Sequence, residues 1–236
     1  MGTRAASQQR LRRKTARAVR ALEAHFGVPE RGPPRPLLDS LVQTILSQST
    51  SDRNSGRAFR SLRERFPTWE AALAAGPGEI EAAIRSGGLA RQKSVRIHKL
   101  LRWVREESGS LDLSPLRQMP TEEVFAALLP LEGVGVKTVA VVLLFACGRD
   151  CFAVDTHVHR IVRRLGLVGQ KATAEKTFER MRPLVPEGKA HSFHVNLLRL
   201  GRTLCRPRGP RCPECPLRRL CDYARQASPR ADGDPT

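Results

Sequence analysis

The sequence lacks most of the features from which β-sheets and membrane spans are built. Aromatic residues make up 5% of the 236 residues, and there is a single tyrosine. Alternation of apolar and polar residues is scarce, whereas apolar residues recur at helical spacing along most of the chain. No apolar run approaches the ~18 residues that a membrane-spanning helix requires, so we expect no membrane partner. These absences predict an all-α fold of roughly ten helices.

Acidic residues are also in short supply. There are 23 acidic against 41 basic residues, which gives a formal net charge of +18, and only seven of the basic residues are lysine. Such a charge favours a polyanionic partner, with nucleic acid first and an anionic membrane surface second. The arginine bias suits bidentate phosphate contacts, although a GC-rich genome would produce the same bias.

The chain start shows no secretory signal pattern, so we expect a reducing, cytoplasmic location. Residues 1–22 contain six arginines, one lysine and no acid. This composition fits either a mitochondrial transit peptide or a basic helix. We favour the helix, because Ala16, Val19, Leu22 and Phe26 have helical spacing.

The main cluster of candidate metal ligands, near the end of the chain, consists of cysteines and contains no histidine. Four cysteines follow the pattern C-x6-C-x2-C-x5-C, at Cys205, Cys212, Cys215 and Cys221. Four thiolates suit either a [4Fe–4S] cluster or a structural zinc site, and the spacing alone favours iron–sulphur without excluding zinc. The loop that these cysteines enclose carries three arginines, for which we predict phosphate contacts: Arg206, Arg208 and Arg211. Cys147 and Cys151 lie in apolar surroundings and are interpreted as buried hydrophobic residues.

A pair of glycines interrupts the helical pattern at residues 131–138. Gly133 and Gly135, with Val134 between them, allow a tight turn that presents backbone N–H groups at the start of a helix. This arrangement favours a helix-hairpin-helix at about 121–147, a module that binds the DNA backbone without reading the base sequence. We expect caps at Asp52, Thr68 and Thr121 for three of the helices.

Two side chains near this segment are candidates for chemistry. Lys137 lies in the first helical turn, where the helix dipole disfavours a cation and so favours a nucleophilic neutral amine. Asp155 precedes another helix. The residues alone favour simpler interpretations, namely an ordinary phosphate-facing lysine and an N-cap aspartate.

Taken together and in this order, the motifs resemble those of the endonuclease III family of DNA glycosylases. The resemblance covers about residues 14–223 and rests on L-x-G-V-G-x-K-T, A-V-D-T-H and the cysteine pattern. It implies two helical domains: a six-helix barrel at 30–149, and a second domain formed by 1–29 with 150–225 that holds a [4Fe–4S] cluster at 205–221. The active site would lie in the cleft between them. Residues 226–236 are expected to form a disordered tail.

The same resemblance implies the activity. Lys137 would be the Schiff-base nucleophile and Asp155 its charged partner in a bifunctional glycosylase and abasic-site lyase of base excision repair. The substrate would be double-stranded DNA with oxidised pyrimidines or abasic sites, bound by a monomer in the bacterial nucleoid. The alternatives are a monofunctional glycosylase and a catalytically weak damage-binding protein. The family pattern also assigns DNA contacts to Gln48, Ser49, Leu89 and His157.

Several positions depart from the family pattern. Glu132 replaces the usual proline of L-P-G-V-G, and Val136 stands where a basic residue is common. In the segment that helps to fill the gap left by a flipped base, Ser49 takes the place of the usual glutamine and Gln48 comes one position early. Leu89 matches the second gap-filling position. These departures bear on substrate range and activity more than on the class of reaction.

Overall fold

The computed structural model of the chain describes residues 2–227, and within that range every regular element is helical. The all-α prediction is therefore confirmed. Two compact units are present: Met1–Gly32 with Asp150–Thr236, and Pro33–Arg149. The predicted division into domains with boundaries at 30 and 150 stays a prediction. The predicted disordered tail lies outside the described residues, except for 226 and 227, which belong to the last helix.

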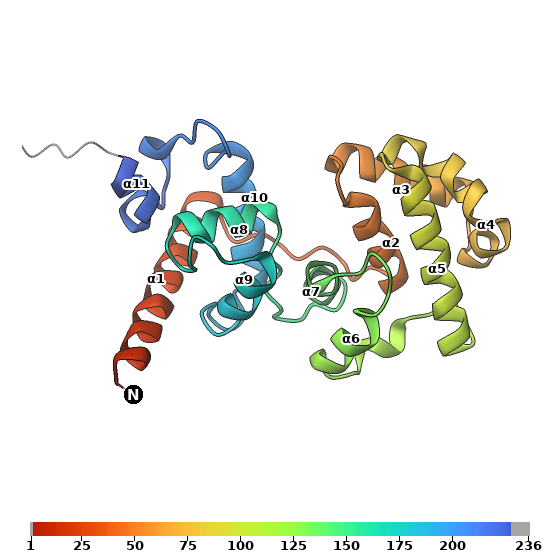
Figure 1. Cartoon of the computed structure of the whole chain (residues 1–236), viewed down its shortest axis with the longest axis horizontal. Helices are drawn as coiled ribbons and strands as arrows, with labels where there is room; N and C mark the ends of the chain where they lie inside the picture. The colour runs from red at the N-terminus through yellow and green to blue at the C-terminus, as the bar shows by residue number, and fades with distance from the viewer. Residues whose placement is uncertain (1, 228–236) are drawn as a thin grey trace, which may run out of the picture. The chain divides into compact units, whose positions relative to one another are not determined.

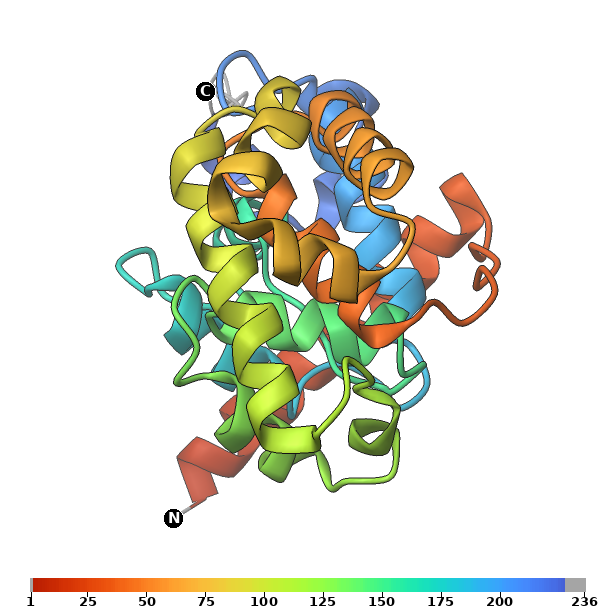
Figure 2. The ribbon, with the colours of Figure 1, turned by 90° about the vertical axis from the view of Figure 1, so that its right-hand side faces the viewer.

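The unit Pro33–Arg149 contains six α-helices among its described residues (Figure 1). They are α2 (Leu37–Ser47), α3 (Asp52–Arg65), α4 (Trp69–Ile84), α5 (Ala90–Ser108), α6 (Thr121–Leu128) and α7 (Val136–Phe145). Two 3₁₀ turns, η1 (Arg85–Gly87) and η2 (Ser114–Arg117), lie between them. Helix α5 packs along α4, and α2 packs against α3, α5 and α7 (Figures 1 and 2).

The core of this unit follows the predicted helical spacing. The inward residues of α2 and α5 are fully or nearly fully buried: Leu38, Leu41, Ile45, Leu46, Ile97, Leu100, Leu101 and Val104. Helix α4 is broken at Gly76, whose φ of 79° is non-helical, and Pro77 follows in the second half. Pro77 is accommodated directly after this break, because proline is tolerated in a first helical turn.

The second unit is built from both ends of the chain. Its elements are α1 (Gly2–Phe26), α8 (Thr156–Arg164), α9 (Ala174–Met181), α10 (Ala190–Thr203), η3 (Cys212–Glu214), η4 (Arg218–Leu220) and α11 (Asp222–Ala227). Helix α10 packs against both α1 and α8. Ala18, Val19 and Leu22 of α1 are buried there, so the basic N-terminal segment contributes to the core as a helix. Among residues 2–227, no helix has the length and hydropathy needed to cross a membrane.

Two of the three predicted helix caps are wrong. Ser51, not Asp52, caps α3, since its side chain accepts a hydrogen bond from the Asn54 N–H at 3.3 Å. Pro120 occupies the cap position of α6, and Thr121 instead accepts a hydrogen bond from Arg149. Both helices thus begin one residue earlier than predicted. The Thr68 cap of α4 is confirmed by its bond from the Ala71 N–H.

Candidate functional site

The predicted hairpin is present as α6, a tight turn and α7. Within the turn, the Val134 N–H donates to the Leu131 carbonyl at 3.0 Å, and the Thr138 N–H donates to the Gly135 carbonyl at 2.8 Å. Gly133 has a φ of +84°, in the left-handed region that favours glycine. A Cβ atom there would lie 2.6 Å from Cδ of Arg96, so the turn also requires glycine for a close approach.

A polar network attaches this turn to α5 and to the end of α2. Gln48 donates its Nε2 hydrogen to the Gly133 carbonyl at 2.8 Å and accepts a bond from Arg96 at 3.4 Å. Glu132, at the position of the usual proline, binds Lys99 at 2.6 Å. The hydrogen bond and the positive charge of Lys99 hold the pKa of the Glu132 carboxyl below its usual value. The substituted acid therefore fastens the turn to α5 instead of facing a phosphate unpaired.

Lys137 is the second residue of α7 and is half-buried. Within the part of the chain that the structure describes, its amine has no hydrogen-bond or ion-pair partner. The first turn of α7 also contains no acidic residue. The Lys137 amine therefore lies at a helix start without a neutralising partner among the described residues.

The two predicted gap-filling positions share an unusual backbone conformation. Ser49 and Leu89, with φ angles of 52° and 50°, are the only non-glycine residues at positive φ among those described. Both are exposed, and Leu89 retains 54% of its surface although it is large and apolar. Such conformations cost about 1–3 kcal/mol and cluster at functional sites. This strain is consistent with the predicted role.

Lys93 connects the two segments that carry these residues. Its ammonium group donates to the carbonyls of Leu46, at 2.7 Å, and Gly87, at 2.9 Å. The residue is 1% exposed, and burial, together with the nearby charge of Arg96, lowers its pKa. The end of α2 and the end of η1 are therefore fastened to one buried cation, which sequence reasoning missed. The sequence did offer one signal for it, because Lys93 follows the predicted gap-filling residue Leu89 by four residues, about one helical turn.

Asp155 is the N-cap of α8, as the simpler interpretation had it. Its Oδ1 atom accepts a hydrogen bond from the Val158 N–H at 2.7 Å, and the side chain is half-buried. His157 follows on the same helix, and its Nδ1 atom accepts a bond from Arg160 at 3.0 Å. A Cβ at Gly201 would lie 2.6 Å from that Nδ1 atom, so glycine is needed where α10 passes His157.

The four cysteines of the C-terminal loop lie close enough to influence one another. The pKa of the Cys215 thiol is raised to about 11, first by burial and further by the charges of Cys205, Cys221 and Cys212. No group of three or more histidine, cysteine or acidic side chains among the described residues is arranged to hold a single metal ion. Four mutually repelling thiolates fit an iron–sulphur cluster as a donor set, because bound iron would neutralise them.

Arg164 of α8 holds this loop at both ends. Its guanidinium donates to Sγ of Cys205 at 3.2 Å and to the carbonyls of Arg206 and Pro207, while its own carbonyl accepts from Cys221. Arg160, one turn earlier, donates to the Cys205 carbonyl at 2.9 Å. Sequence reasoning missed both arginines, although their separation of four residues placed them on one face of the helix that follows Asp155. Helix α8 thus carries Asp155 at one end and the cysteine loop at the other.

The three loop arginines differ from one another. Arg206 and Arg208 are exposed, and within residues 2–227 their side chains have no partner. Arg211 is already paired, donating its Nε hydrogen to Glu214 at 2.6 Å. The guanidinium groups of Arg206 and Arg208 are therefore available to bind an anion. Arg211 would have to divide its charge between that anion and Glu214.

Comparisons with known proteins agree with these features. Residues 42–187 match the family model described as "HhH-GPD superfamily base excision DNA repair protein". The chain is 36% identical to endonuclease III of Thermotoga maritima over 79% of this chain and 83% of that protein. It is 44% identical to an Arabidopsis thaliana protein named "Putative DNA glycosylase", over 64% of this chain but only 52% of that protein.

A solved structure is similar over nearly the whole chain. It is a trapped covalent intermediate between endonuclease III and DNA, with a TM-score of 0.77 and 27% sequence identity. The match covers 93% of this chain and 97% of the other.

Proposed function

This chain belongs to the HhH-GPD superfamily of base excision DNA repair proteins as an endonuclease III-like DNA glycosylase, and we propose that it is also an abasic-site lyase. The observation that carries the lyase proposal is the unpaired, half-buried amine of Lys137 directly after the hairpin turn. The covalent protein–DNA intermediate trapped in the similar endonuclease III supports the same chemistry.

Lys137 would act as the nucleophile on a nucleotide flipped out of the duplex. Its neutral amine attacks C1′ of the sugar, a C–N bond forms, and the N-glycosidic bond breaks with its electron pair leaving on the base. The bound nitrogen loses one proton, and the sugar ring opens as its ring oxygen takes up a proton, which yields a protonated Schiff base. This iminium acidifies the C2′ proton, whose removal expels the 3′ phosphate by β-elimination. Water then hydrolyses the Schiff base and releases the amine.

Asp155 would assist this sequence as a carboxylate. Its Oδ1 atom is held by the Val158 N–H, which fixes the orientation of the carboxyl group and leaves Oδ2 without a hydrogen-bond partner among residues 2–227. A carboxylate so fixed can accept a proton from the attacking amine and stabilise the positive charge that develops on the sugar. We propose oxidised pyrimidines as the damaged bases, as the endonuclease III resemblance implies.

We further propose that Cys205, Cys212, Cys215 and Cys221 hold a [4Fe–4S] cluster. When bound, such a cluster supplies iron–thiolate bonds that fix the loop. The Arg164 guanidinium, which donates a hydrogen bond to Sγ of Cys205, would help to hold that ligand in place. Arg206 and Arg208 would then be presented to DNA phosphates from a rigid loop.

Borohydride trapping on a duplex with an abasic site tests the lyase proposal. The wild-type protein should form a stable covalent adduct, and Lys137→Gln should bind the duplex but form none. Lys99→Gln is a matched control, since it removes an amine from α5 that is bound to Glu132. Trapping at the wild-type yield in Lys137→Gln would overturn the assignment. Base release by the wild type without any trapping would indicate a monofunctional glycosylase instead.

A further inference from the structure

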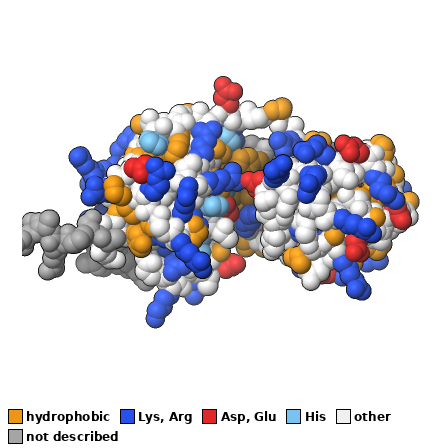
Figure 3. Space-filling view, turned by 90° about the horizontal axis from the view of Figure 1, so that it is seen from above, with side chains coloured by type: hydrophobic (Ala, Val, Ile, Leu, Met, Phe, Trp, Pro, Cys, Tyr) orange, Lys and Arg blue, Asp and Glu red, His pale blue; other side chains and the backbone are white. Residues whose placement is uncertain are grey.

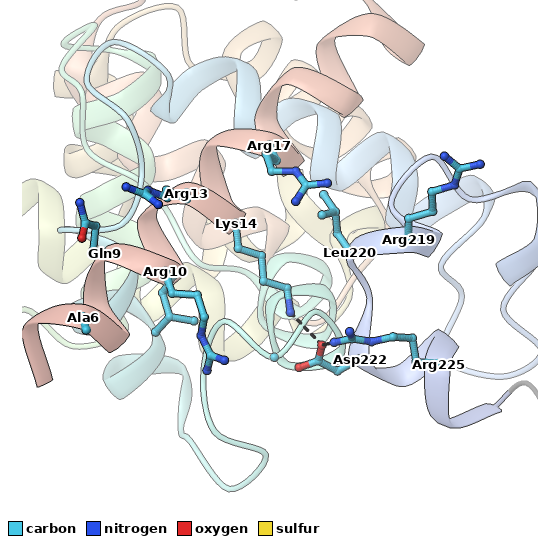
Figure 4. A pocket seen from close by; sticks show the side chains of 12 residues that line it. Ala6, Gln9, Arg10, Arg13, Lys14, Arg17, Arg219, Leu220, Asp222 and Arg225 are labelled. Carbon is cyan, nitrogen blue, oxygen red and sulfur yellow. Dashed lines mark hydrogen bonds and ion pairs between the residues drawn. The ribbon is translucent and has the colours of Figure 1, made fainter. Parts of the chain in front are cut away.

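A strongly basic pocket lies between α1 and residues 219–225, which comprise the end of the cysteine loop and the start of α11 (Figure 4). It has a volume of about 500 Å³ and belongs entirely to the unit built from both chain ends. Among the described residues, six cationic side chains and a single acidic one line it: Arg10, Arg13, Lys14, Arg17, Arg219, Arg225 and Asp222. None of the candidate glycosylase residues is among its lining residues.

Ion pairs and a hydrogen bond hold three of the lining residues in place. Asp222 binds Lys14 at 2.8 Å and also pairs with Arg225 (Figure 4). Lys14 donates a second hydrogen bond to the Leu165 carbonyl. Gly166, with a φ of +71°, leaves room for the carboxyl of Asp222, because a Cβ there would overlap it at 1.8 Å. The single acid of the pocket is therefore already shared by two of the six cations.

The remaining four cations are not neutralised. Arg10, Arg13 and Arg17 are exposed on α1, Arg219 is exposed on η4, and none of the four side chains has a partner within residues 2–227. Guanidinium groups that line one pocket repel one another unless an anion lies between them. The pocket is thus suited to an anion of several charges.

The spacing of these arginines indicates which anion. Positions 10, 13 and 17 recur at helical spacing and span about 10 Å of α1 at 1.5 Å per residue. One strand of duplex DNA carries a phosphate every ~3.4 Å along its axis, so this span corresponds to about three phosphates. None of the described lining residues is aromatic, which leaves no platform on which a base could stack.

We propose that this pocket binds the sugar–phosphate backbone of DNA, as a second contact that does not depend on base sequence or on a lesion. The blander interpretation is a solvated basic face. The two differ in how binding responds to salt, because each phosphate contact releases counterions and contributes about −0.9 to the slope of log affinity against log salt concentration.

The test uses a triple variant and a control with an equal loss of charge. In the full-length protein, Arg10→Ala, Arg13→Ala and Arg17→Ala remove three exposed cations, and alanine preserves the helix. The control, Lys171→Ala with Lys176→Ala and Arg180→Ala, removes three exposed cations from the same unit that do not line the pocket. Circular dichroism checks that helix content is retained in both.

Affinity for an undamaged labelled duplex of about 30 base pairs is then measured across salt concentrations. The pocket variant should bind more weakly, with a slope shallower by about 2–3, whereas the control should retain the wild-type slope. Equal changes in both variants would show a general charge effect and overturn the proposal. It would also be overturned if neither slope changed, or if tripolyphosphate bound to the pocket while the duplex slope did not depend on it.

This experiment is independent of the proposed chemistry. Undamaged DNA requires neither base release nor strand cleavage, so an inactive Lys137 would leave the measured slopes unaffected. Conversely, an unchanged salt slope in the pocket variant would not contradict borohydride trapping through Lys137.

Discussion

At the scale of single residues, Asp155 combines a structural role with a proposed chemical one. One carboxylate oxygen caps α8 while the other has no partner among the described residues. The cap and the catalytic interpretation therefore do not compete, since they use different atoms. The two roles can be separated by a substitution that keeps the cap and removes the charge.

Asp155→Asn should slow base release in single-turnover assays by about 10²–10⁴-fold, the usual contribution of an acid–base group. The free energy of unfolding should change by less than about 0.5 kcal/mol, because asparagine caps helices as well as aspartate. Thr173→Ala is the opposite control, since it removes the cap of α9 and should cost about 1 kcal/mol in stability without slowing the reaction. A rate for Asp155→Asn equal to the wild type would leave Asp155 as a cap alone.

Lys93 gives a pH-dependent prediction. Its lowered pKa means that the unfolded chain, near the usual value of 10.5, retains the proton more readily than the folded protein. Between the two pKa values the unfolded state binds more protons, so the free energy of unfolding rises with pH in that window. The destabilising effect is fully present below the folded pKa. In urea titrations, the wild type should therefore gain stability relative to Lys93→Met as the pH approaches 10.5, and parallel curves would contradict this.

At the scale of elements, the hairpin depends on one glycine more than on the other. Gly133 has a φ of +84° and closely approaches Arg96, whereas Gly135 is extended at φ −99° with open space around its Cβ position. Gly133→Ser should lower the free energy of unfolding by about 1–2 kcal/mol, the cost of the left-handed conformation. Gly135→Ser should be tolerated, because serine is a favoured N-cap. Thermal or urea unfolding of the two variants checks this, and equal losses would contradict it.

Two arginines of the cysteine loop, Arg208 and Arg211, can be compared in the same way. Arg208 has no partner among residues 2–227, and Arg211 is bound to Glu214. If the loop contacts phosphates, Arg208→Ala should weaken binding to damaged and undamaged duplexes alike and make the salt slope shallower by roughly 0.9. Arg211→Ala should have a smaller effect, since its charge is already shared. A slope and affinity for Arg208→Ala equal to those of the wild type would identify the loop as a solvated surface.

At the scale of the whole molecule, lysine and arginine side chains are spread over the face that Figure 3 draws. Most of the net charge of +18 nevertheless belongs to the sequence of the unit built from both chain ends, with 25 basic and 11 acidic residues, whereas Pro33–Arg149 has 16 basic and 12 acidic residues. The candidate groups are likewise divided, with Lys137 and the hairpin in one unit and Asp155 with the cysteine loop in the other. The cysteine loop is attached to the rest of its unit by a contact with α8 and, through the ion pair between Asp222 and Lys14, with α1. Loss of metal should therefore affect one unit of the molecule and not the other.

The purified protein should be yellow-brown and contain about four irons per chain. Cys212→Ser should remove the metal and, in hydrogen-exchange measurements, increase exchange in the cysteine loop and the α8 segment that holds it. Residues of the unit Pro33–Arg149 should keep their protection, because metal binding is coupled only to the folding of the segment that carries the ligands. A colourless protein with one zinc per chain would overturn the cluster.

Local pattern was sufficient for most of the helices. Apolar spacing predicted the helical class and the basic helix at the start of the chain, because burial of one helical face selects the residues on it. Helix caps were predicted less well. Serine and aspartate are similarly favoured at the N-cap, and only the extended backbone at Ser51 decides that it, and not Asp52, caps α3. The family resemblance, which rests on the hairpin, Asp155 and cysteine motifs, was also recoverable from the sequence and is confirmed.

The sequence by itself determined the helical class, the net charge and the order of the chemical motifs, because these depend on residue type and spacing along the chain. Only the tertiary structure decided which side chains are free. It brought Lys93 to two carbonyls, Glu132 to Lys99 and Arg164 to the cysteine loop, and it left Arg208 and four arginines around the α1 pocket without partners among the described residues. Such pairings join residues far apart in the chain, and they follow from how helices pack, which local pattern does not encode.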